Sequence, residues 1–367
     1  MTTVDCISYE HVHGSPTIPE ESTERHDNMP TRKKVSFGHG TIVLFDDEEE
    51  EHATEPARKT CTPHDVDDTP SIAPEDTYKL RSEYNEDEQP GSRVKFCQTG
   101  SQSGQLHHAT DVGVMGNGDL VVTDMICSKL KVFTSSGVVG CVYAADDVSE
   151  PWGATDIGSE KIAVTSRKSQ SVVIVCKTWG NVLKRFGNGF FKSPCGITNV
   201  GDSTVIVTDD VANRVSIHDV NGGKVVAYIG EHLQFKNPRY VAVSANGNII
   251  VSDSGNHSIK VFDRNRNFVR SFGKYGRSDG CFRFPHGVCT DSHNNILVAD
   301  QYNSRVSVFD ELGRFSCHIV TSLHGVQHPQ GVALTSDLRL CVTVGDMKPN
   351  RLLIFQLDRI DKETEES

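Results

Sequence analysis

The chain has 367 residues, of which 37 are Lys or Arg and 49 are Asp or Glu, for a formal net charge of −12. No apolar run approaches the ~18 residues that a membrane-spanning helix needs, and the N-terminus lacks the apolar stretch of a signal peptide. The 11 cysteines include no Cys-x-x-Cys pair. These features exclude a helical membrane protein and favour a soluble, cytoplasmic one with reduced, buried cysteines.

The N-terminal quarter of the chain differs in charge from the rest. Residues 1–91 carry 8 basic and 22 acidic side chains, whereas residues 92–357 carry 27 and 22. The first segment is rich in Pro, Thr, Asp and Glu and has no hydrophobic periodicity, so it cannot bury enough apolar surface to offset chain entropy. We therefore expect a disordered acidic tail over residues 1–91, followed by a mildly basic domain that suits an anionic partner.

Within this tail, residues 32–45 form a basic and apolar island. Its core is Lys34, Val35, Ser36 and Phe37. This core resembles the RVxF motif with which regulatory subunits dock on protein phosphatase 1. The resemblance implies an extended peptide on a sheet edge, with Val35 and Phe37 in two apolar pockets and residues 42–45 continuing along the same edge. A phosphate on Ser36 would add about two negative charges and weaken docking. The alternative is an apolar patch flanked by acids.

From residue 92 onward, one pattern recurs six times at intervals of 43 to 47 residues. A turn residue leads into an apolar strand, a Gly/Asn turn, a hydrophobic run ending near Asp, and a strand ending in an aromatic. The fourth repeat predicts strands at 241–244, 249–252, 259–262 and 268–272. A period of this size built from short strands indicates an all-β fold, a six-bladed β-propeller with four antiparallel strands per blade.

The two ends of the repeat region are complementary. The last repeat stops after the strand at 352–355, whereas residues 93–97 resemble the fourth strand of other repeats. We therefore expect the N-terminal strand 93–97 to complete the sixth blade, which removes two exposed sheet edges. Residues 93–96 also fit the RVxF pattern, but as a closing strand they should be buried. The propeller then spans residues 92–357, followed by an acidic C-terminal tail at 358–367.

These repeats resemble NHL repeats, the propeller module of the tripartite-motif (TRIM-NHL) proteins. The resemblance implies recognition of RNA or of protein partners on one face, and in some members ubiquitin transfer directed by a separate RING domain. This chain departs from that architecture because it has no Cys/His cluster with zinc-ligand spacing, and so no RING or B-box. Three repeats also depart from the pattern: His108 stands in place of the usual Pro, and Ser166 and Val344 in place of the usual Asp.

The loops that follow the second and fourth strands of each blade emerge on one face, where cations and aromatic residues alternate. That mixture suits RNA, because cations meet phosphates while rings stack on bases. The candidate RNA- or partner-binding residues are Lys129, Trp152, Arg167, Arg214, Arg239, Tyr240, His257, His286, Tyr302 and Arg305. The alternative for Arg214 and Arg305 is an ion pair with an Asp of a neighbouring blade. The Asp at 124, 209, 253 and 300 should cap loops.

A catalytic role finds little support in the sequence. Propeller lactonases and lyases need converging carboxylates, Asn or His around the central channel, and the inner strands here offer no such set. We therefore predict a non-enzymatic adaptor without metal or cofactor, whose propeller binds RNA or protein. The alternatives are a protein phosphatase 1 targeting subunit and a RING-less substrate-recognition component of ubiquitin ligation.

Overall fold

The computed structural model describes residues 33–37, 40–44, 78–80, 94–95, 105–135, 138–143, 148–201, 203–345 and 350–359. The chain divides into two units, Met1–Thr69 and Pro70–Ser367.

In the first unit the structure describes a β-hairpin. Strand β1 (Lys33–Phe37) pairs antiparallel with β2 (Gly40–Leu44), and Val35 lies opposite Ile42. The docking-like motif is therefore in an extended strand, in a segment where the sequence predicted disorder. Because β1 and β2 pair antiparallel, residues 42–44 lie beside the motif instead of continuing along its line. The rest of the predicted tail up to residue 77 lies outside the described residues.

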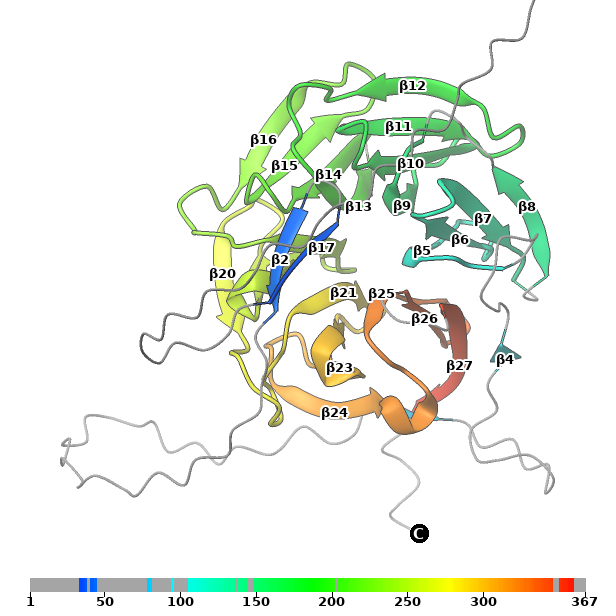
Figure 1. The fold of residues 1–367 in the computed structure, drawn as a ribbon. Coiled ribbons are helices and arrows are strands. Elements are labelled where there is room, and N and C mark those ends of the chain that lie inside the picture. The colour runs from blue at the N-terminus through cyan, green and yellow to red at the C-terminus, as the bar shows by residue number, and fades with distance from the viewer. Residues whose placement is uncertain are drawn as a thin grey trace, which may run out of the picture. The chain divides into compact units, whose positions relative to one another are not determined.

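The second unit is a six-bladed propeller, as the repeats predicted, and each blade is an antiparallel sheet whose strands follow one another in the chain (Figure 1). Blade 1 holds β5 (Ala109–Val114), β6 (Leu120–Asp124), β7 (Lys129–Phe133) and β8 (Val139–Tyr143). Blade 2 holds β9 (Pro151–Asp156), β10 (Lys161–Ser166), β11 (Ser171–Cys176) and β12 (Val182–Phe186). Blade 3 holds β13 (Pro194–Gly201), β14 (Thr204–Asp209), β15 (Arg214–Asp219) and β16 (Val225–Ile229). Blade 4 holds β17 (Pro238–Val243), β18 (Ile249–Asp253), β19 (Ser258–Phe262) and β20 (Phe268–Phe272). Blade 5 holds β21 (Pro285–Thr290), β22 (Ile296–Asp300), β23 (Arg305–Phe309) and β24 (Phe315–Val320). Blade 6 holds β25 (Pro329–Leu334), β26 (Arg339–Val344) and β27 (Arg351–Arg359).

Alternating side chains pack each blade against its neighbours. The second strands are buried on both faces and consist mostly of Val, Ile and Leu. In blades 1, 3, 4 and 5 the third strand alternates apolar residues with Lys, Ser, Arg or His. The three single-turn helices are η1 (Ser254–Asn256), η2 (Gln301–Asn303) and η3 (Ser322–His324). In the described ranges no helix has the length and apolar character required to cross a membrane.

Strand pairing corrects one assignment in the first repeat. Ala109 pairs with Asp124 in the same register in which Pro194 pairs with Asp209. Ala109, and not His108, therefore takes the place of the proline that opens the other blades. Ser166 does stand at the aspartate position of blade 2, since it pairs with Pro151.

The ring closes through the last blade as predicted, but over a longer stretch. Strand β4 (Val94–Lys95) pairs antiparallel with β27 at Leu353 and Ile354. A further strand, β3 (Tyr78–Leu80), pairs with residues 357–359 of the same β27. The predicted boundaries at 91/92 and 357/358 therefore need correction, because residues on both outer sides of them belong to the propeller.

Burial of one aromatic ring explains the additional strand. The Tyr78 side chain is 4% exposed and packs in the core cluster that contains Leu357 and Ile319. Its hydroxyl donates a hydrogen bond to Asp291 of blade 5. A buried tyrosine body with a satisfied hydroxyl stabilises a strand that is too short to stand out in the sequence.

The described part of the chain contains eight cysteines, all of them free thiols. Cys195, Cys281 and Cys341 are buried. Burial raises the pKa of the Cys195 and Cys341 thiols to about 12, so both stay protonated at neutral pH. They act as small apolar core residues, as the sequence predicted.

Candidate ligand-binding face

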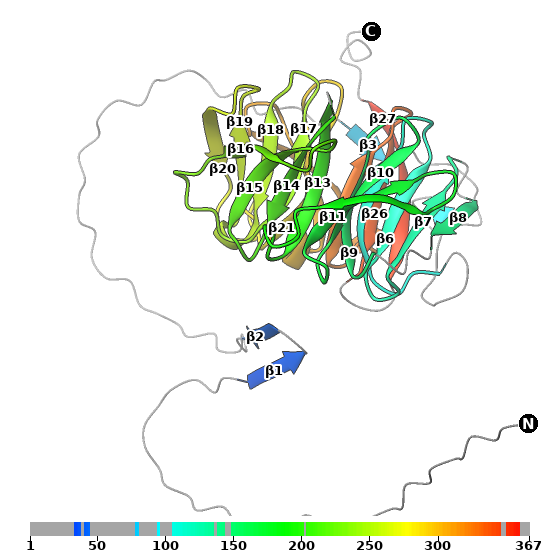
Figure 2. The ribbon, with the colours of Figure 1, turned by 90° about the horizontal axis from the view of Figure 1, so that it is seen from above.

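One face of the propeller carries the loops that leave the second strand of each blade and those that lead into the next blade. Seen from the side in Figure 2, the strands run between this loop face and the opposite face. All ten candidate binding residues lie in these loops or at the strand ends beside them. The structure places three of them in an axial cluster and two in an aromatic strip, and the other five lie in the interior or apart from the centre of the face.

A buried aspartate at the end of the second strand organises each of blades 1, 3, 4 and 5. Asp300 accepts hydrogen bonds from the Arg283 N–H at 2.7 Å, from Asn303 Nδ2 at 2.7 Å and from Arg305 Nε at 2.9 Å. It therefore joins the loop entering its blade to the third strand. Asp124, Asp209 and Asp253 make equivalent contacts. These aspartates are structural, but they bind mainly N–H groups of the loop that enters the blade, and not only the loop after the second strand that they were predicted to cap.

The predicted ligand contact Arg305 is one of the partners of these aspartates. It is 8% exposed and donates to the carbonyl oxygens of Arg277, Ser278 and Cys281 as well as to Asp300. Its donors are used within blade 5, so it cannot reach a ligand without repacking. The partner aspartate belongs to the same blade, not to a neighbouring one as the alternative interpretation held.

Arg214 and Lys129 also lie apart from the centre of the face. Arg214 lies 3.5 Å from Asp209, again within its own blade, and its guanidinium carbon is 3.8 Å from the centre of the Phe190 ring. In blade 1 it is Lys131, and not Lys129, that pairs with Asp124, at 3.1 Å with both side chains buried. Lys129 is half-buried.

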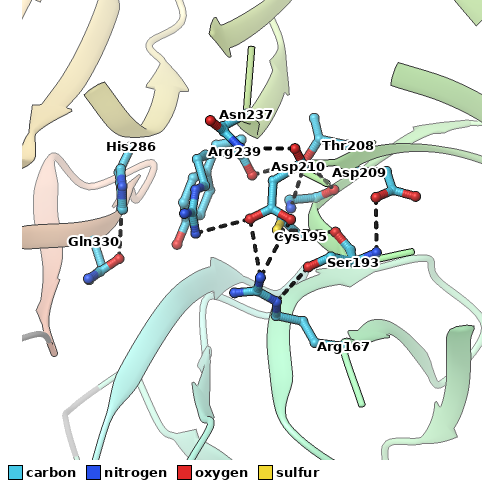
Figure 3. Close-up of polar contacts among 12 residues, drawn as sticks. Arg167, Ser193, Cys195, Thr208, Asp209, Asp210, Asn237, Arg239, His286 and Gln330 are labelled. Atoms are coloured by element: carbon cyan, nitrogen blue, oxygen red, sulfur yellow. Dashed lines mark hydrogen bonds and ion pairs between the residues drawn. The ribbon is translucent and has the colours of Figure 1, made fainter. Parts of the chain in front are cut away.

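The axial cluster consists of Trp152, Arg167, Asp210 and Arg239. Figure 3 shows Asp210 between the two arginines. Asp210 Oδ2 bridges Arg167 Nη2 at 3.2 Å and Arg239 Nη1 at 3.3 Å. The two guanidinium carbons lie 4.4 and 5.2 Å from the centre of the Trp152 ring. One carboxylate thus serves two arginines, and each arginine side chain is 24% exposed. The cluster keeps a net positive charge within reach of a ligand.

Tyr240 closes the propeller axis beneath this cluster. The Tyr240 side chain is 4% exposed, and its hydroxyl donates to the carbonyl oxygen of Thr110 in blade 1. The main contacts between strands of different blades all join neighbours in the ring, so blades 1 and 4 are opposite one another. Tyr240 therefore spans the centre and is a structural residue, not the ligand contact that the sequence predicted.

Close packing at the axis restricts the residues that the inner strands can carry, and blade 4 is unusual in having a tyrosine where most blades have a glycine. The backbone N–H groups of Gly153, Gly196, Tyr240 and Gly331 all donate to a Ser or Thr hydroxyl of the second strand. A Cβ at Gly196 would lie 2.6 Å from the Cα of Tyr240 and 2.7 Å from the Arg239 oxygen. Glycines line most of the axis because neighbouring inner strands approach too closely for side chains. The side chain of Tyr240 fills the space that remains.

Blade 1 places a carboxyl group at the same position. Asp111 donates its backbone N–H to Thr123 Oγ1, and its Oδ2 accepts from the Ala154 N–H at 3.1 Å. Burial raises the pKa of Asp111 from 3.8 to about 7, although the hydrogen bonds from backbone N–H groups oppose the shift.

His286 is also part of the interior. It is 5% exposed, and its Nδ1 is hydrogen-bonded to Gln330 Oε1 at 2.8 Å (Figure 3). Burial and the nearby Arg239 lower the pKa of His286 to about 3. The imidazole is therefore neutral at physiological pH and adds no charge to the face.

The aromatic strip is a chain of five rings: Tyr275, His257, Phe284, Tyr302 and His328. Successive ring centres lie 5.0, 4.5, 5.3 and 5.4 Å apart. Tyr275, Phe284 and Tyr302 are 60%, 40% and 44% exposed, respectively. The guanidinium carbon of Arg283 lies 5.8 Å from the centre of the Tyr275 ring. Burial, Lys236 and Arg283 lower the pKa of His257.

Of this strip, only His257 and Tyr302 were predicted from the sequence as binding residues. Phe284 and His328 directly precede the prolines that open blades 5 and 6, and they adopt left-handed φ values of 55° and 46°. Asn237, which tolerates this region well, occupies the same position in blade 4 with φ 49°. A phenylalanine there is strained and exposed, which is typical of functional positions. An aromatic residue directly before the proline is the signal that could have identified it.

The described residues contain no group of three or more His, Cys, Asp or Glu side chains that could hold a metal ion. The arrangement of the face suits planar and anionic groups: exposed rings for stacking and arginines for charge.

Comparison with known proteins agrees with this architecture. The NHL repeat model matches residues 235–262 and 282–309, in blades 4 and 5. Protein brain tumor of Drosophila melanogaster is 28% identical over 124 residues, which cover 33% of this chain and 12% of that protein. The chain therefore corresponds to a small part of this relative.

Solved structures share the fold at low sequence identity. A gluconolactonase from Xanthomonas campestris has a TM-score of 0.58 and 15% identity, with 78% of this chain and 97% of the other covered. Virginiamycin B lyase from Staphylococcus aureus has a TM-score of 0.52 and 12% identity, covering 68% and 80%. These structures establish the propeller alone. Blades 4 and 5 of this six-bladed propeller thus match the NHL repeat model, and the spacing and strand order of the other blades follow the same pattern.

Proposed function

We propose that this protein is a non-enzymatic adaptor whose loop face binds single-stranded RNA. The observation that carries the proposal is the aromatic strip, a chain of five rings with tilted or edge-to-face contacts, in which the rings of Tyr275, Phe284 and Tyr302 are exposed. Splayed bases stack on such rings regardless of sequence, and cations beside them contact phosphates. The strip supplies the stacking surface, and Arg283, Arg167 and Arg239 supply the charge.

The axis of the ring supports a binding role over a catalytic one. Tyr240 spans the centre, and its hydroxyl is engaged by Thr110. His286 is buried and uncharged. Asp111 and His286, the titratable groups described at the axis, are buried and engaged by the Ala154 N–H and by Gln330, and the described residues hold no group of three or more His, Cys, Asp or Glu that could bind a metal ion. The similarity to a lactonase and a lyase is at the level of fold, and fold does not imply function.

The test is fluorescence anisotropy of the full chain with a pool of short single-stranded RNAs at two salt concentrations. We expect binding that survives moderate salt, because the stacking of bases on the rings does not depend on phosphate contacts. Phe284→Ala should weaken it at least about fivefold, because stacking on one ring contributes about 1–3 kcal/mol per base. Arg239→Glu should weaken binding and make its salt dependence shallower, because fewer cations then contact phosphates.

Phe268→Ala is the matched control, because it removes an equally exposed phenylalanine (40%) from the rim strand β20. Its RNA affinity should equal that of the wild type. Absence of RNA binding by the folded wild-type chain would assign the face to protein partners instead.

A second candidate function concerns the hairpin. Strand β1 holds Lys34–Phe37 in the extended conformation that a phosphatase-docking peptide adopts. A protein phosphatase 1 targeting subunit would use the hairpin for docking and the propeller for the substrate. Val35→Ala with Phe37→Ala should then abolish co-purification of the phosphatase, and persistence of the complex would exclude this function. A link to ubiquitin ligation rests on the family resemblance alone.

A further inference from the structure

The outermost strand of each blade exposes one edge. Its unpaired backbone N–H and C=O groups can accept another strand, and natural proteins usually protect such edges with charges, glycines or covering segments. In blade 6 the N-terminal strands β4 and β3 cover the edge of β27. In the described residues no further strand pairs with β8, β12, β16, β20 or β24.

Four of these five rim strands carry a feature that disfavours pairing. Lys184 stands at the centre of β12 and Arg270 at the centre of β20. Strand β24 carries His318. Strand β8 has Gly140 beside its centre, and its apolar side chains are largely half-buried.

Strand β16 has no such protection. Its five residues are Val225, Val226, Ala227, Tyr228 and Ile229. None is charged, all except Ala227 favour strands, and the outward side chains of Val226 and Tyr228 are 55% and 38% exposed. Tyr228 stacks on Phe190, with ring centres 6.3 Å apart, so its position is defined by the fold. This is the rim edge of the propeller most open to another strand.

We propose that β16 pairs antiparallel with β16 of a second copy of this chain, making a homodimer through a continuous eight-stranded sheet. A two-fold axis through Ala227, normal to the sheet, brings Val226 of each copy opposite Tyr228 of the other. Aromatic and β-branched residues are favourable cross-strand partners. Self-complementarity of this kind is what a two-fold interface requires.

Charge favours a second copy as the occupant. The two-fold places the exposed Lys224 opposite Gly230 of the other copy, one residue from the exposed Glu231, at both ends of the paired strands. The same operation on β12 would bring Lys184 opposite Lys184, and on β20 it would bring Arg270 opposite Arg270. Like charges directly opposite destabilise a strand pair, so self-pairing is favoured at β16 and opposed at these two neighbours.

The dimer leaves the aromatic strip open. Antiparallel pairing of two rim strands points the two propeller axes in opposite directions, so the loop faces of the copies look away from each other. Each copy would then offer its own ligand face. The proposal does not depend on what that face binds.

The test is sedimentation velocity of the full chain over a range of concentrations, without RNA. We expect a concentration-dependent monomer–dimer equilibrium for the wild type. Val226→Glu with Tyr228→Glu places like charges opposite each other twice and should weaken association at least about tenfold. Val226→Lys with Tyr228→Glu places opposite charges in the same two positions and should retain the dimer, with a dependence on salt.

Phe268→Glu with Val269→Glu on β20 is the matched control and should leave association unchanged. Circular dichroism melts establish that each variant is folded. The proposal is overturned if the wild type is monomeric throughout, if the double-glutamate variant associates as the wild type does, or if the folded charge-paired variant does not associate.

Discussion

Asp111→Asn is expected to make the propeller more stable than the wild type at pH 8, by up to roughly 4 kcal/mol, and about equally stable near pH 4. The reason is the burial of this carboxyl at the axis, which raises its pKa to about 7 in the folded protein. In the unfolded chain the pKa returns to about 3.9. Asparagine imitates the neutral acid and can still accept from the Ala154 N–H.

The sign follows from proton counting. Between about pH 4 and pH 7 the folded state keeps the Asp111 proton while the unfolded state has lost it. The stability contributed by this group therefore falls as pH rises through that interval and is constant above it. The variant lacks this dependence, so the difference between the two proteins should grow from pH 4 to pH 7 and then level off.

Two buried histidines make the stability depend on pH in the opposite sense. Burial lowers the pKa of His286 to about 3 and that of His218 to about 4. Their neutral forms favour folding, so their contribution rises with pH up to the unfolded pKa of about 6.5. Both are present in wild type and variant and cancel in the difference. Urea denaturation of both proteins from pH 4 to pH 8 measures the difference in their free energies of unfolding. A pH-independent difference would contradict the raised pKa of Asp111.

Asp300→Asn is expected to lower the free energy of unfolding by about 3–5 kcal/mol. Asp300 is fully buried and Arg305 is 8% exposed. The amide still accepts the Arg283 N–H, but the guanidinium then lies in the interior without its counter-charge. Chemical denaturation at neutral pH measures the loss.

Asp310→Asn is a control in the same blade. Its partner Arg314 is an exposed side chain (60%) at 2.5 Å, and the carboxylate also accepts the turn N–H groups of Leu312 and Arg314. Exposed pairs contribute about 0–1 kcal/mol, so this variant should lose at most that much. Equal losses in the two variants would mean that Asp300 and Arg305 do not form a buried hub.

The two predictions depend on Asp111 and on Arg305, and the roles of these two residues became visible only in three dimensions. Arg305 stood out in the sequence as a cation in a loop of the binding face. The Arg305 side chain is oriented by Asp300, five residues earlier, and by carbonyl oxygens of residues 277–281. The folding of blade 5 brings these oxygens around the guanidinium. Tyr240 likewise points to the axis because the five other inner strands meet there, and Thr110 on the far side accepts its hydroxyl.

The blade count, the four-stranded sheets and the closure by β4 were readable in the sequence because they depend on local signals. Turn residues, strand alternation and a constant period recur in every repeat, and each copy strengthens the interpretation of the others. Strand β3 was missed because three residues carry no periodicity. The burial of Tyr78 between blades 5 and 6 stabilises it.

The sequence by itself therefore determined the architecture of this protein and which face gathers its loops, since both follow from the period and the direction of the strands. Tertiary structure decided which side chains on that face remain available to a ligand. In the folded protein Tyr240, His286 and Arg305 are buried, and Phe284 contacts rings from neighbouring loops. The physical reason is that burial and ring-to-ring distance arise between blades, where residues far apart in the chain meet.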